Sequence, residues 1–459
     1  MESTSKITVF PSGPLRGTLA APGDKSISHR ALICGALAEG ESLIVGLLEG
    51  SDVLATRAAL ERLGARIRKT APGCWSVIGV GRRGWRQPDA PLDFGNSGTG
   101  VRLVMGAVAS TPIAVTFKGD ASLSRRPMGR VLQPLRLIGI ETGDRGSAGP
   151  EDHLPVSLKG AARPQAITYH VPIPSAQVKS AILLAGLNVP GETCVIEAAP
   201  TRDHTERMLR AFGVDLVEDM TPEGHVRICL AGRRGLSACR IEVPGDPSSA
   251  AFMAVAALIV PGSEVTITDV LMNPLRTGLY QSLAEMGAEI TYTNRRSLSG
   301  EPVADLCLRA GTLKGVKIPA ERAPSMIDEY PILAVAAACA RGTTVLSGLA
   351  ELRVKESDRL RAMAAGLAAC GIRVEEGADS LIVHGCGTDD GLGTVPGGAQ
   401  ISTYHDHRIA MSFLVMGLAA RQPVSVDGAA MIETSFPGFQ DMMTTLGADL
   451  RGGSEGARL

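Results

Sequence analysis

The sequence has few aromatic residues and no excess of either charge. Aromatic residues make up 3% of the 459 residues, and 46 Lys and Arg stand against 47 Asp and Glu. Proteins that bind nucleic acid usually carry a basic surplus, so this balance argues against a nucleic-acid partner. With so few aromatic rings, the core has to be built from Ala, Leu, Val, Ile and Met, which suits closely packed helices.

Metal-binding cysteine motifs and membrane-spanning runs are also missing. The nine cysteines form no C-x-x-C pair and have no ligand-like spacing, which argues against zinc, iron–sulfur clusters and a disulfide framework and predicts buried, reduced thiols. The first residues, MESTSKITVFPSG, lack the basic and apolar regions of a secretory signal. The longest apolar run, 250–260, is too short to cross a bilayer. These absences predict a cytoplasmic protein without a membrane partner.

An internal repeat is the most informative feature that is present. An apolar residue followed by Gly and then by alternating apolar residues occurs six times, at Gly64, Gly139, Gly213, Gly287, Gly371 and Gly447. This pattern is typical of a helix that ends at a glycine cap and leads into a strand. We therefore expect six copies of one structural unit.

A second pattern repeats in phase with these glycines. A polar or glycine-rich turn opens an Ala/Leu-rich stretch of helical length at 23–37, 95–109, 174–187, 245–258, 324–338 and 405–418. Stretches such as 265–270 and 343–349 lie between the two helices of a unit and are typical of strands. The triplet PGD occurs at 22–24 and again at 244–246, which splits the six units into three and three. We predict one domain over 25–244 and another formed by 1–24 together with 245–459.

Residues that bind anions or move protons occupy the starts of the predicted first helices. They are Lys25, Ser26, Asn96, Gly98, Ser175, Gln177, Asp328, His407 and Arg408. Free N–H groups and the helix dipole make such a start an anion site, although Ser and Asn are also ordinary N-caps. The second helices add further cations near their starts, namely Arg126, Arg202, Arg276, Lys355 and Arg359. Cations that recur at equivalent places predict a cleft for a small molecule with several negative charges.

Two carboxylates, Asp328 and Glu356, lie within this cationic set. General acid–base chemistry needs one ionised and one protonated group, and carboxylates in different surroundings can supply both. The neighbouring cations favour ionised Glu356, so burial or a substrate's negative charge would have to keep a proton there. The alternative is an exposed salt bridge between Glu356 and Arg359, three residues apart on a helix.

Other motifs carry less weight. The string GVGRRG at 79–84 fits a dinucleotide-binding pattern but is followed by WRQPDAP, so we expect a turn. His405 and His407 are two residues apart and no third ligand is near in the sequence, so we predict no metal site. The sequence has neither a P-loop nor a GxSxG motif, and no cofactor is expected.

Nine strings in order carry a resemblance to a known family: PGDKSISHRA, FGNSGTGVR, RRPMGRV, PSAQVKSAILLAGL, TRDHTE, APSMIDEYPILAVAAA, ELRVKESDRL, DHRIAMS and TSFPGF. With them the chain resembles the 5-enolpyruvylshikimate-3-phosphate synthases, or 3-phosphoshikimate 1-carboxyvinyltransferases, of the second (class II) sequence group. The resemblance implies an α/β fold, a two-domain inside-out α/β barrel of six βαβαββ repeats with the active site in the interdomain cleft. It also implies enolpyruvyl transfer from phosphoenolpyruvate to the 5-hydroxyl of shikimate 3-phosphate.

The resemblance also implies roles for individual residues. Shikimate 3-phosphate would be held by Lys25, Ser26, Arg30, Ser175, Ala176, Gln177, Arg202, Asp328 and Lys355. Phosphoenolpyruvate would be held by Lys25, Asn96, Gly98, Arg126, Gln177, Arg359 and Arg408. The catalytic residues would be Asp328, Glu356 and Lys25. The resemblance further implies a monomer, with glyphosate as an inhibitor.

Some positions depart from the family pattern. Thr434 stands where many members have Lys, Glu351 where many have Asn, and Leu275 where the second group usually has Thr. Gly98 leaves room where glyphosate-tolerant members carry an Ala methyl, so we expect stronger inhibition than in those relatives.

Two other functions stay open at this point. One is the related transfer of an enolpyruvyl group to UDP-N-acetylglucosamine. That activity resides in enzymes with a reactive Cys or Asp on an Arg-rich loop, for which we find no counterpart. The other is a non-catalytic anion-binding module, against which the presence of both Asp328 and Glu356 argues.

Overall fold

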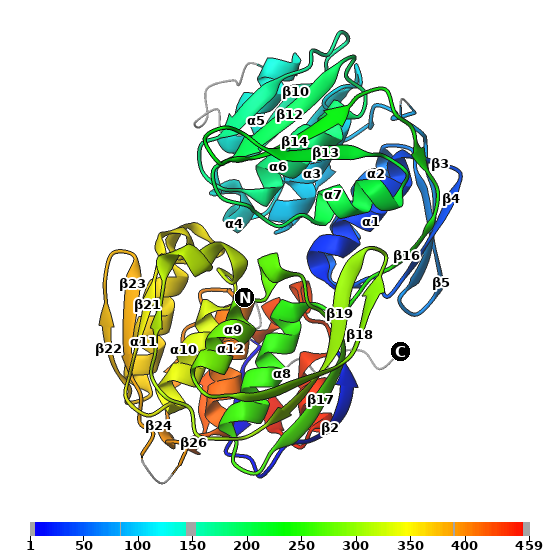
Figure 1. Cartoon of the computed structure of the whole chain (residues 1–459). Helices are drawn as coiled ribbons and strands as arrows, with labels where there is room; N and C mark the ends of the chain where they lie inside the picture. Colours follow the sequence, from blue (N-terminus) through cyan, green and yellow to red (C-terminus); the bar gives the residue numbers. More distant parts are fainter. Residues whose placement is uncertain (1–4, 83, 144–152, 389–390, 453–459) are drawn as a thin grey trace. The chain divides into compact units, whose positions relative to one another are not determined.

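The chain divides into two compact units (Figure 1). The computed structural model describes residues 5–82, 84–143, 153–388 and 391–452. Unit 1 comprises Met1–Pro22, Pro244–Arg296 and Pro302–Leu459, and unit 2 comprises Gly23–Val243 and Ser297–Glu301. The two main divisions fall beside the PGD triplets, whereas nothing in the sequence indicated that Ser297–Glu301 belongs to unit 2.

Unit 2 contains three repeats of the same element order. The first consists of β16 (Arg240–Glu242), α1 (Lys25–Leu37), β4 (Glu41–Val45), α2 (Ser51–Arg62), β5 (Arg66–Ala71) and β6 (Cys74–Ile78). The second consists of β7 (Leu92–Asp93), α3 (Gly98–Val108), β8 (Ala114–Lys118), α4 (Ala121–Ser124), α5 (Gly129–Ile138), β9 (Glu141–Thr142) and β10 (Val156–Lys159). The third consists of β11 (Thr168–Val171), α6 (Ala176–Gly186), β12 (Glu192–Glu197), α7 (His204–Ala211), β13 (Leu216–Met220) and β14 (Val226–Ala231).

Unit 1 contains the other three repeats. The fourth consists of β2 (Arg16–Ala20), α8 (Pro247–Ile259), β17 (Glu264–Leu271), α9 (Gly278–Glu285), β18 (Glu289–Leu298) and β19 (Glu301–Arg309). The fifth consists of β20 (Lys317–Ile318), α10 (Tyr330–Cys339), β21 (Thr343–Ser347), α11 (Arg359–Ala369), β22 (Arg373–Glu376) and β23 (Ser380–His384). The sixth consists of β25 (Gln400–Ile401), α12 (His407–Leu418), β27 (Val424–Val426), α13 (Phe439–Thr445), β28 (Asp449–Gly452) and β1 (Ile7–Phe10).

One pairing pattern recurs in the six four-stranded sheets formed by the described residues. In each sheet an edge strand pairs in parallel with the second strand, as β11 does with β12 and β20 with β21. The second strand then pairs antiparallel with the third, as β12 does with β14 and β21 with β23. This pattern confirms the prediction of six repeats in two sets of three.

Three of these sheets are completed by strands that are distant in sequence. Strand β16 pairs with β4, so the end of the unit 2 segment closes the sheet of the first repeat. Strand β2 pairs with β17, and β1 pairs with both β27 and β28. Residues before Pro22 therefore complete two sheets of unit 1.

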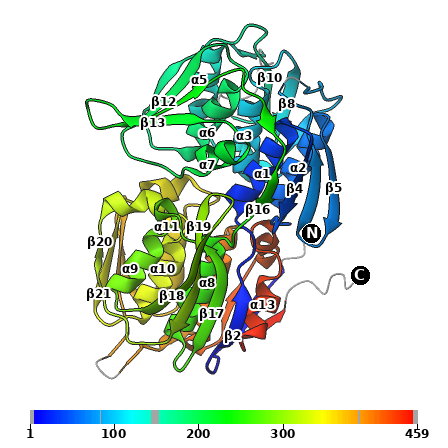
Figure 2. The ribbon, with the colours of Figure 1, turned by 45° about the vertical axis from the view of Figure 1, so that its right-hand side comes forward.

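The six predicted cap glycines follow α2, α5, α7, α9, α11 and α13. Their φ angles run from 83° to 114°, a left-handed conformation that favours glycine. The first helices of each set pack together in the core, α8 against α10 and α12 in unit 1, and α3 against α1 and α6 in unit 2 (Figures 1 and 2). All residues of α8 and α10 are buried. Small side chains permit this packing, since a Cβ on Gly106 of α3 would lie 2.4 Å from the carbonyl oxygen of Ala181 in α6.

The expectation of reduced thiols throughout was wrong at two cysteines. Cys194 of β12 and Cys229 of β14 lie opposite each other and form a disulfide, with Cα atoms 4.2 Å apart. They are 35 residues apart in sequence, so their proximity depends on strand register and gives no local motif. The other seven cysteines are free.

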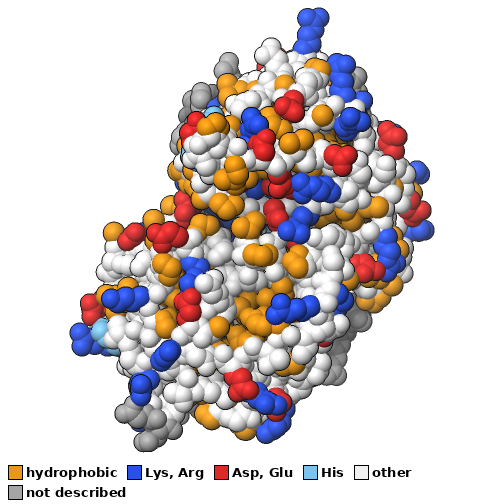
Figure 3. Space-filling model, viewed as in Figure 1, with side chains coloured by type: hydrophobic (Ala, Val, Ile, Leu, Met, Phe, Trp, Pro, Cys, Tyr) orange, Lys and Arg blue, Asp and Glu red, His pale blue; other side chains and the backbone are white. Residues whose placement is uncertain are grey.

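Two further sequence predictions concern the surface and the membrane. On the face drawn in Figure 3, each unit carries Lys and Arg interspersed with Asp and Glu, with no broad field of one charge. Among the described residues, no helix combines the length and the apolar character needed to cross a membrane.

Candidate active site

In unit 2, the start of α1 carries Lys25, Ser26 and Arg30. Asp24 caps the helix, and its carboxylate accepts a hydrogen bond from the backbone N–H of Ile27 at 2.7 Å. Lys25 is the first helical residue, and its ammonium group forms an ion pair with Asp52 of α2. The Lys25 side chain is 21% exposed, so it has access to solvent from a partly enclosed position.

Arg30 lies one turn further into α1 and is only 3% exposed. Its guanidinium donates from Nε to Thr205 Oγ1 at 2.7 Å, from Nη1 to the carbonyl of Ser26 at 3.0 Å and from Nη2 to Ser180 Oγ at 2.8 Å. Burial lowers the pKa of Arg30 to about 10, although the nearby carboxylates of Glu206 and Asp24 act in the opposite direction. The predicted substrate ligand is therefore held firmly by the protein itself.

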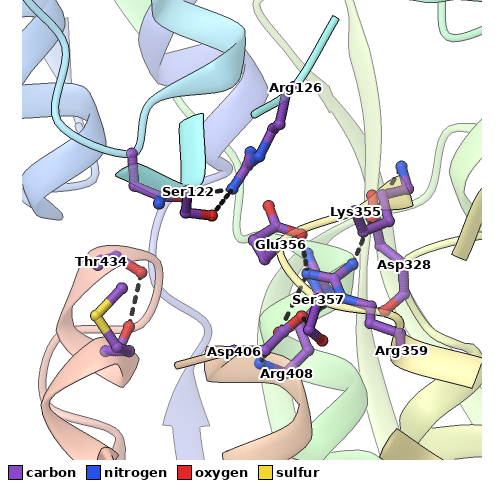
Figure 4. A network of polar contacts seen from close by, with 12 residues as sticks. Ser122, Arg126, Asp328, Lys355, Glu356, Ser357, Arg359, Asp406, Arg408 and Thr434 are labelled. Atoms are coloured by element: carbon purple, nitrogen blue, oxygen red, sulfur yellow. Dashed lines mark hydrogen bonds and ion pairs between the residues drawn. The ribbon is translucent and has the colours of Figure 1, made fainter. Parts of the chain in front are cut away.

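The start of α3 brings Asn96, Gly98 and Arg126 together. Ser97 caps the helix, and its hydroxyl accepts a hydrogen bond from the N–H of Gly100 at 3.3 Å. Asn96 Oδ1 accepts a hydrogen bond from Arg126 Nη2 at 2.6 Å. Arg126 Nη2 also lies 3.4 Å from Ser122 Oγ (Figure 4). A Cβ on Gly98 would lie 3.0 Å from Arg102 Nη1 and 3.1 Å from Arg126 Nη1, so two guanidinium groups adjoin this glycine.

Sequence reasoning missed Arg102, which links the starts of α3 and α6. Its Nη1 donates to the carbonyl of Gly98 at 3.2 Å and to Gln177 Oε1 at 3.0 Å, and its Nη2 donates to the carbonyl of Pro127 at 3.0 Å. The sequence could have indicated Arg102 through its position in GTGVR, four residues after Gly98. Residues four apart lie on the same face of a helix.

The start of α6 supplies Ser175, Ala176 and Gln177. Ser175 is the N-cap residue, and its hydroxyl lies 3.4 Å from the N–H of Val178. Gln177 donates from Nε2 to Thr99 Oγ1 at 3.0 Å, so both ends of its amide are fixed by residues of α3. Arg202 lies just before α7, after the buried Thr201, and the buried Thr205 lies in the first turn of that helix.

In unit 1, the predicted residues Asp328, Lys355, Glu356, Arg359 and Arg408 form one polar network (Figure 4). Arg359 is the first residue of α11 and is 1% exposed. Its Nη1 lies 3.2 Å from Asp328 Oδ1 and its Nη2 lies 2.5 Å from Glu356 Oε2. Burial disfavours the charged guanidinium, but the carboxylates of Asp406, Glu356 and Asp328 together raise the pKa of Arg359 above its ordinary value.

Asp406 also belongs to this network, although it was not among the predicted site residues. It is fully buried at the N-cap of α12 and accepts hydrogen bonds from Arg359 Nε at 2.8 Å, from Ser357 Oγ at 3.0 Å and from the N–H of Arg408 at 3.0 Å. Arg408 in turn donates from Nη1 to the carbonyl of Asp328 at 3.1 Å. One buried carboxylate thus holds the guanidinium of Arg359 and the backbone of Arg408.

The two candidate catalytic carboxylates are less enclosed than their partners. The side chains of Asp328 and Glu356 are 17% and 19% exposed. Lys355 Nζ lies 3.7 Å from Asp328 Oδ1. The alternative of a wholly exposed Glu356–Arg359 pair is wrong, because the pair exists but its guanidinium is buried.

Arg276 does not join the predicted anion-binding set. It is 3% exposed, and its Nη2 lies 3.3 Å from Asp246 Oδ1 and 3.1 Å from Ser248 Oγ. These contacts hold the start of α8, so the recurrence of cations misled at this position.

The three departures from the family pattern have different surroundings. The Thr434 hydroxyl donates to the carbonyl of Met431 at 2.7 Å, inside a short helical turn at Ala429–Thr434. Glu351 and Leu275 are both partly buried.

Two groups of candidate metal ligands occur among the described residues, and neither contains a predicted site residue. Glu192 lies beside the disulfide of Cys194 and Cys229. In the second group, Asp203 Oδ2 and Glu301 Oε2 lie 2.8 Å and 3.6 Å from Arg207 Nε, and His204 Nδ1 lies 2.7 Å from Glu301 Oε1. An ion pair therefore occupies the second group.

The comparisons agree with the geometry. Residues 9–443 match the family model of EPSP synthase (3-phosphoshikimate 1-carboxyvinyltransferase). Proteins named 3-phosphoshikimate 1-carboxyvinyltransferase from Parvibaculum lavamentivorans and Cereibacter sphaeroides are 59% and 58% identical to the chain. These alignments cover 98% and 97% of this chain and 98% of each relative. A solved EPSP synthase from Acinetobacter baumannii superimposes with a TM-score of 0.87 at 43% identity, covering 98% of this chain and all of that structure.

Proposed function

Since the chain belongs to the EPSP synthase family and transfers the enolpyruvyl group of phosphoenolpyruvate to the 5-hydroxyl of shikimate 3-phosphate, we propose that Asp328 and Glu356 are its acid–base pair. The product is a precursor of chorismate and the aromatic amino acids. The observation that carries the proposal is the network of unit 1, where both carboxylates share the buried guanidinium of Arg359 yet keep part of their surface exposed.

In this proposal Asp328 removes the proton of the 5-hydroxyl, and Lys355 and Arg359 stabilise and orient it. Glu356 delivers a proton to the methylene carbon of phosphoenolpyruvate. The 5-oxygen then bonds to the cationic C2, giving a tetrahedral intermediate. Glu356, now a carboxylate, takes a proton back from the new methyl group while phosphate departs with its bonding electrons, which restores the double bond. The hydroxyl proton passes from Asp328 to the released phosphate.

The ion pair of Glu356 and Arg359 supports a link between proton transfer and anion binding. Glu356 has to be protonated to act as the acid, and a neutral carboxyl attracts a guanidinium far less than a carboxylate does. Protonation therefore frees Arg359 Nη2, 2.5 Å from Glu356 Oε2, for a negative group of phosphoenolpyruvate. Protonation of Glu356 therefore both supplies the acid and makes Arg359 available to bind the substrate.

The remaining predicted residues serve as substrate anchors. We assign Lys25, Ser26, Arg30, Ser175, Ala176, Gln177, Arg202, Asp328 and Lys355 to shikimate 3-phosphate. We assign Lys25, Asn96, Gly98, Arg126, Gln177, Arg359 and Arg408 to phosphoenolpyruvate. Arg forks pair with carboxylate and phosphate oxygens, and Gly98 permits a close backbone approach. These residues come from both units, so the proposed turnover requires both units. We also propose that the two domains are 25–244 and 1–24 together with 245–459.

The proposal extends to the sequence group, the inhibitor, the oligomeric state and the cellular location of the protein. The motifs GDKS, SAQVK and RDHTE support membership of the second sequence group. We propose that glyphosate competes with phosphoenolpyruvate beside Gly98, and that the chain acts as a monomer in the cytoplasm.

The deciding experiment measures phosphate release from phosphoenolpyruvate with shikimate 3-phosphate as acceptor. We expect release with this acceptor, none with UDP-N-acetylglucosamine, and a loss of at least about a hundredfold in Asp328→Ala and Glu356→Gln. The exposed carboxylate variant Asp441→Asn serves as the matched control. Full activity in Asp328→Ala would overturn the assignment of the base, and tight binding of shikimate 3-phosphate without turnover would favour an anion-binding module.

A further inference from the structure

Arg30 differs from the other two arginines that are buried among the described residues. Arg276 and Arg359 both form ion pairs with carboxylates. No described carboxylate forms an ion pair with Arg30, whose three hydrogen bonds all go to neutral oxygen atoms. A guanidinium has five N–H groups, so two of them have no acceptor among the described residues. The carboxylates of Glu206 and Asp24 favour the charged guanidinium without bonding to it, so an anion that bonds to the two remaining N–H groups would complete its surroundings.

The two hydroxyls that hold Arg30 have a fixed direction. Ser180 donates to the carbonyl of Ala176 at 2.6 Å, and the oxygens of Ser180 and Thr205 lie 2.6 Å apart. Since the Ser180 proton is used on Ala176, Thr205 must donate to Ser180. Both oxygens are then left as acceptors for Nη2 and Nε of Arg30. The two hydroxyl oxygens therefore accept hydrogen bonds from a guanidinium and have no proton left to donate to an anion.

A buried ionic group fixes the helices that carry these hydroxyls. Lys179 of α6 lies 2.7 Å from Glu197 Oε2 of β12 and 2.8 Å from Glu206 Oε1 of α7. Lys179 precedes Ser180, and Glu206 follows Thr205, so the ion pair joins the two helices beside the hydroxyl pair. The three charged side chains are at most 2% exposed. The carboxylates of Glu197 and Glu206 both bond to Lys179. The N–H groups of Arg30 therefore bond to neutral oxygen atoms instead.

We propose that Ser180 and Thr205 are positioning residues for Arg30, which hold its guanidinium through neutral oxygens so that its two remaining N–H groups receive an anionic group of shikimate 3-phosphate. This inference rests on the proposed function, because it takes Arg30 as a ligand of that substrate. It adds that recognition depends on two buried hydroxyls that do not themselves touch the substrate.

The test is a double-mutant cycle measured by steady-state kinetics and by calorimetric binding of shikimate 3-phosphate. Removal of a hydrogen bond to a charged group predicts a rise of roughly tenfold in the KM for shikimate 3-phosphate in Thr205→Val and in Ser180→Ala. We expect kcat and the KM for phosphoenolpyruvate to change by less than about threefold, since the acid–base pair is untouched. Thr205→Ser should restore binding. In an Arg30→Ala background the further change Thr205→Val should have no effect, because its partner is gone.

Thr193→Val is the matched control. Thr193 is also a fully buried threonine of unit 2, and its hydroxyl has no hydrogen-bond partner among the described residues. We expect this variant to bind shikimate 3-phosphate as the wild type does. Additive effects of Thr205→Val and Arg30→Ala, or an equal loss in Thr193→Val, would overturn the inference. Failure of the proposed function is a separate result, since the wild type itself would then release no phosphate with shikimate 3-phosphate.

Discussion

The carboxylate of Asp406 accepts two hydrogen bonds from the guanidinium of Arg359, one from Nε at 2.8 Å and one from Nη2 at 3.3 Å. Both side chains are buried almost completely. Asp406 also caps α12 and receives the N–H of Arg408. The position of two predicted phosphoenolpyruvate ligands therefore depends on one aspartate.

We expect Asp406→Asn to lower the free energy of unfolding by about 3 kcal/mol, because it leaves a buried guanidinium without its main counter-charge. Asn keeps the N-cap function, so the loss reports on the ion pair and not on the cap. Urea unfolding followed by circular dichroism measures the change. The exposed Asp441→Asn is the control, and a loss no larger in Asp406→Asn than in this control would contradict the argument.

Arg102→Lys should reduce kcat/KM for phosphoenolpyruvate roughly tenfold, since a lysine cannot keep three separate hydrogen bonds in the fork geometry of arginine. The bonds at stake are those to Gly98, Gln177 and Pro127. The exposed Arg62 of α2 offers a control for the same exchange. Equal kinetics for Arg102→Lys and Arg62→Lys would remove Arg102 from the site.

Gly98→Ala should raise the glyphosate inhibition constant by at least about tenfold and raise the KM for phosphoenolpyruvate by less. The new methyl group would lie 3.0 to 3.1 Å from the guanidinium groups of Arg102 and Arg126, so both have to shift. Competition assays at several phosphoenolpyruvate concentrations separate the two constants. Gly13→Ala, at a glycine with no atom within 4 Å of an added Cβ, is the control. An unchanged inhibition constant in Gly98→Ala would refute the steric explanation.

His29 predicts a pH dependence of stability. Burial, followed by the charges of Lys25 and Arg30, lowers the pKa of His29 well below 6.5. The unfolded chain therefore binds a proton below pH 6.5 that the folded chain excludes, and folding loses stability as the pH falls. The slope from this one group is about 1.4 kcal/mol per pH unit until the pH reaches the folded pKa. Between pH 7 and 5, the free energy of unfolding of His29→Gln should fall less steeply than that of the wild type. His170→Gln, at an exposed histidine, should keep the pH dependence of the wild type.

The disulfide predicts a count of thiols. Seven of the nine cysteines are free, so the unfolded, unreduced protein should react with seven equivalents of a thiol reagent and with nine after reduction. Cys194→Ser leaves Cys229 without its partner, so the count should be eight both before and after reduction. Nine reactive thiols without reduction would show that the bond does not form.

Most of the fold was predictable from the sequence, because each repeat carries its own local signals. Cap glycines such as Gly64 and Gly447 have the left-handed conformation that their spacing predicted. The presence of Asp328 and Glu356 within a cationic set was likewise predictable, and the structure brings these carboxylates together with Lys355 and Arg359.

What escaped prediction depends on contacts between distant segments. The sequence showed neither that Asp406 pairs with Arg359, nor that Arg276 turns inward to Asp246, nor that Cys194 faces Cys229. Each of these contacts depends on how helices and strands pack together. A local sequence pattern does not predict that packing. The repeat itself misled for Arg276, because equivalent positions in different repeats can have different neighbours.

The order in which the sheets can be completed has a consequence for synthesis on the ribosome. Strands β1 and β2 are made first, but their partners β27, β28 and β17 follow the whole of the 23–243 segment. Unit 2 can close its own first sheet as soon as β16 emerges. At roughly 5–20 residues per second, β1 waits on the order of 20 to 90 seconds for β28. Strand β1 remains unpaired throughout that interval and β2 until β17 emerges, so chaperones that cover such strand edges should act on this nascent chain before any substrate does.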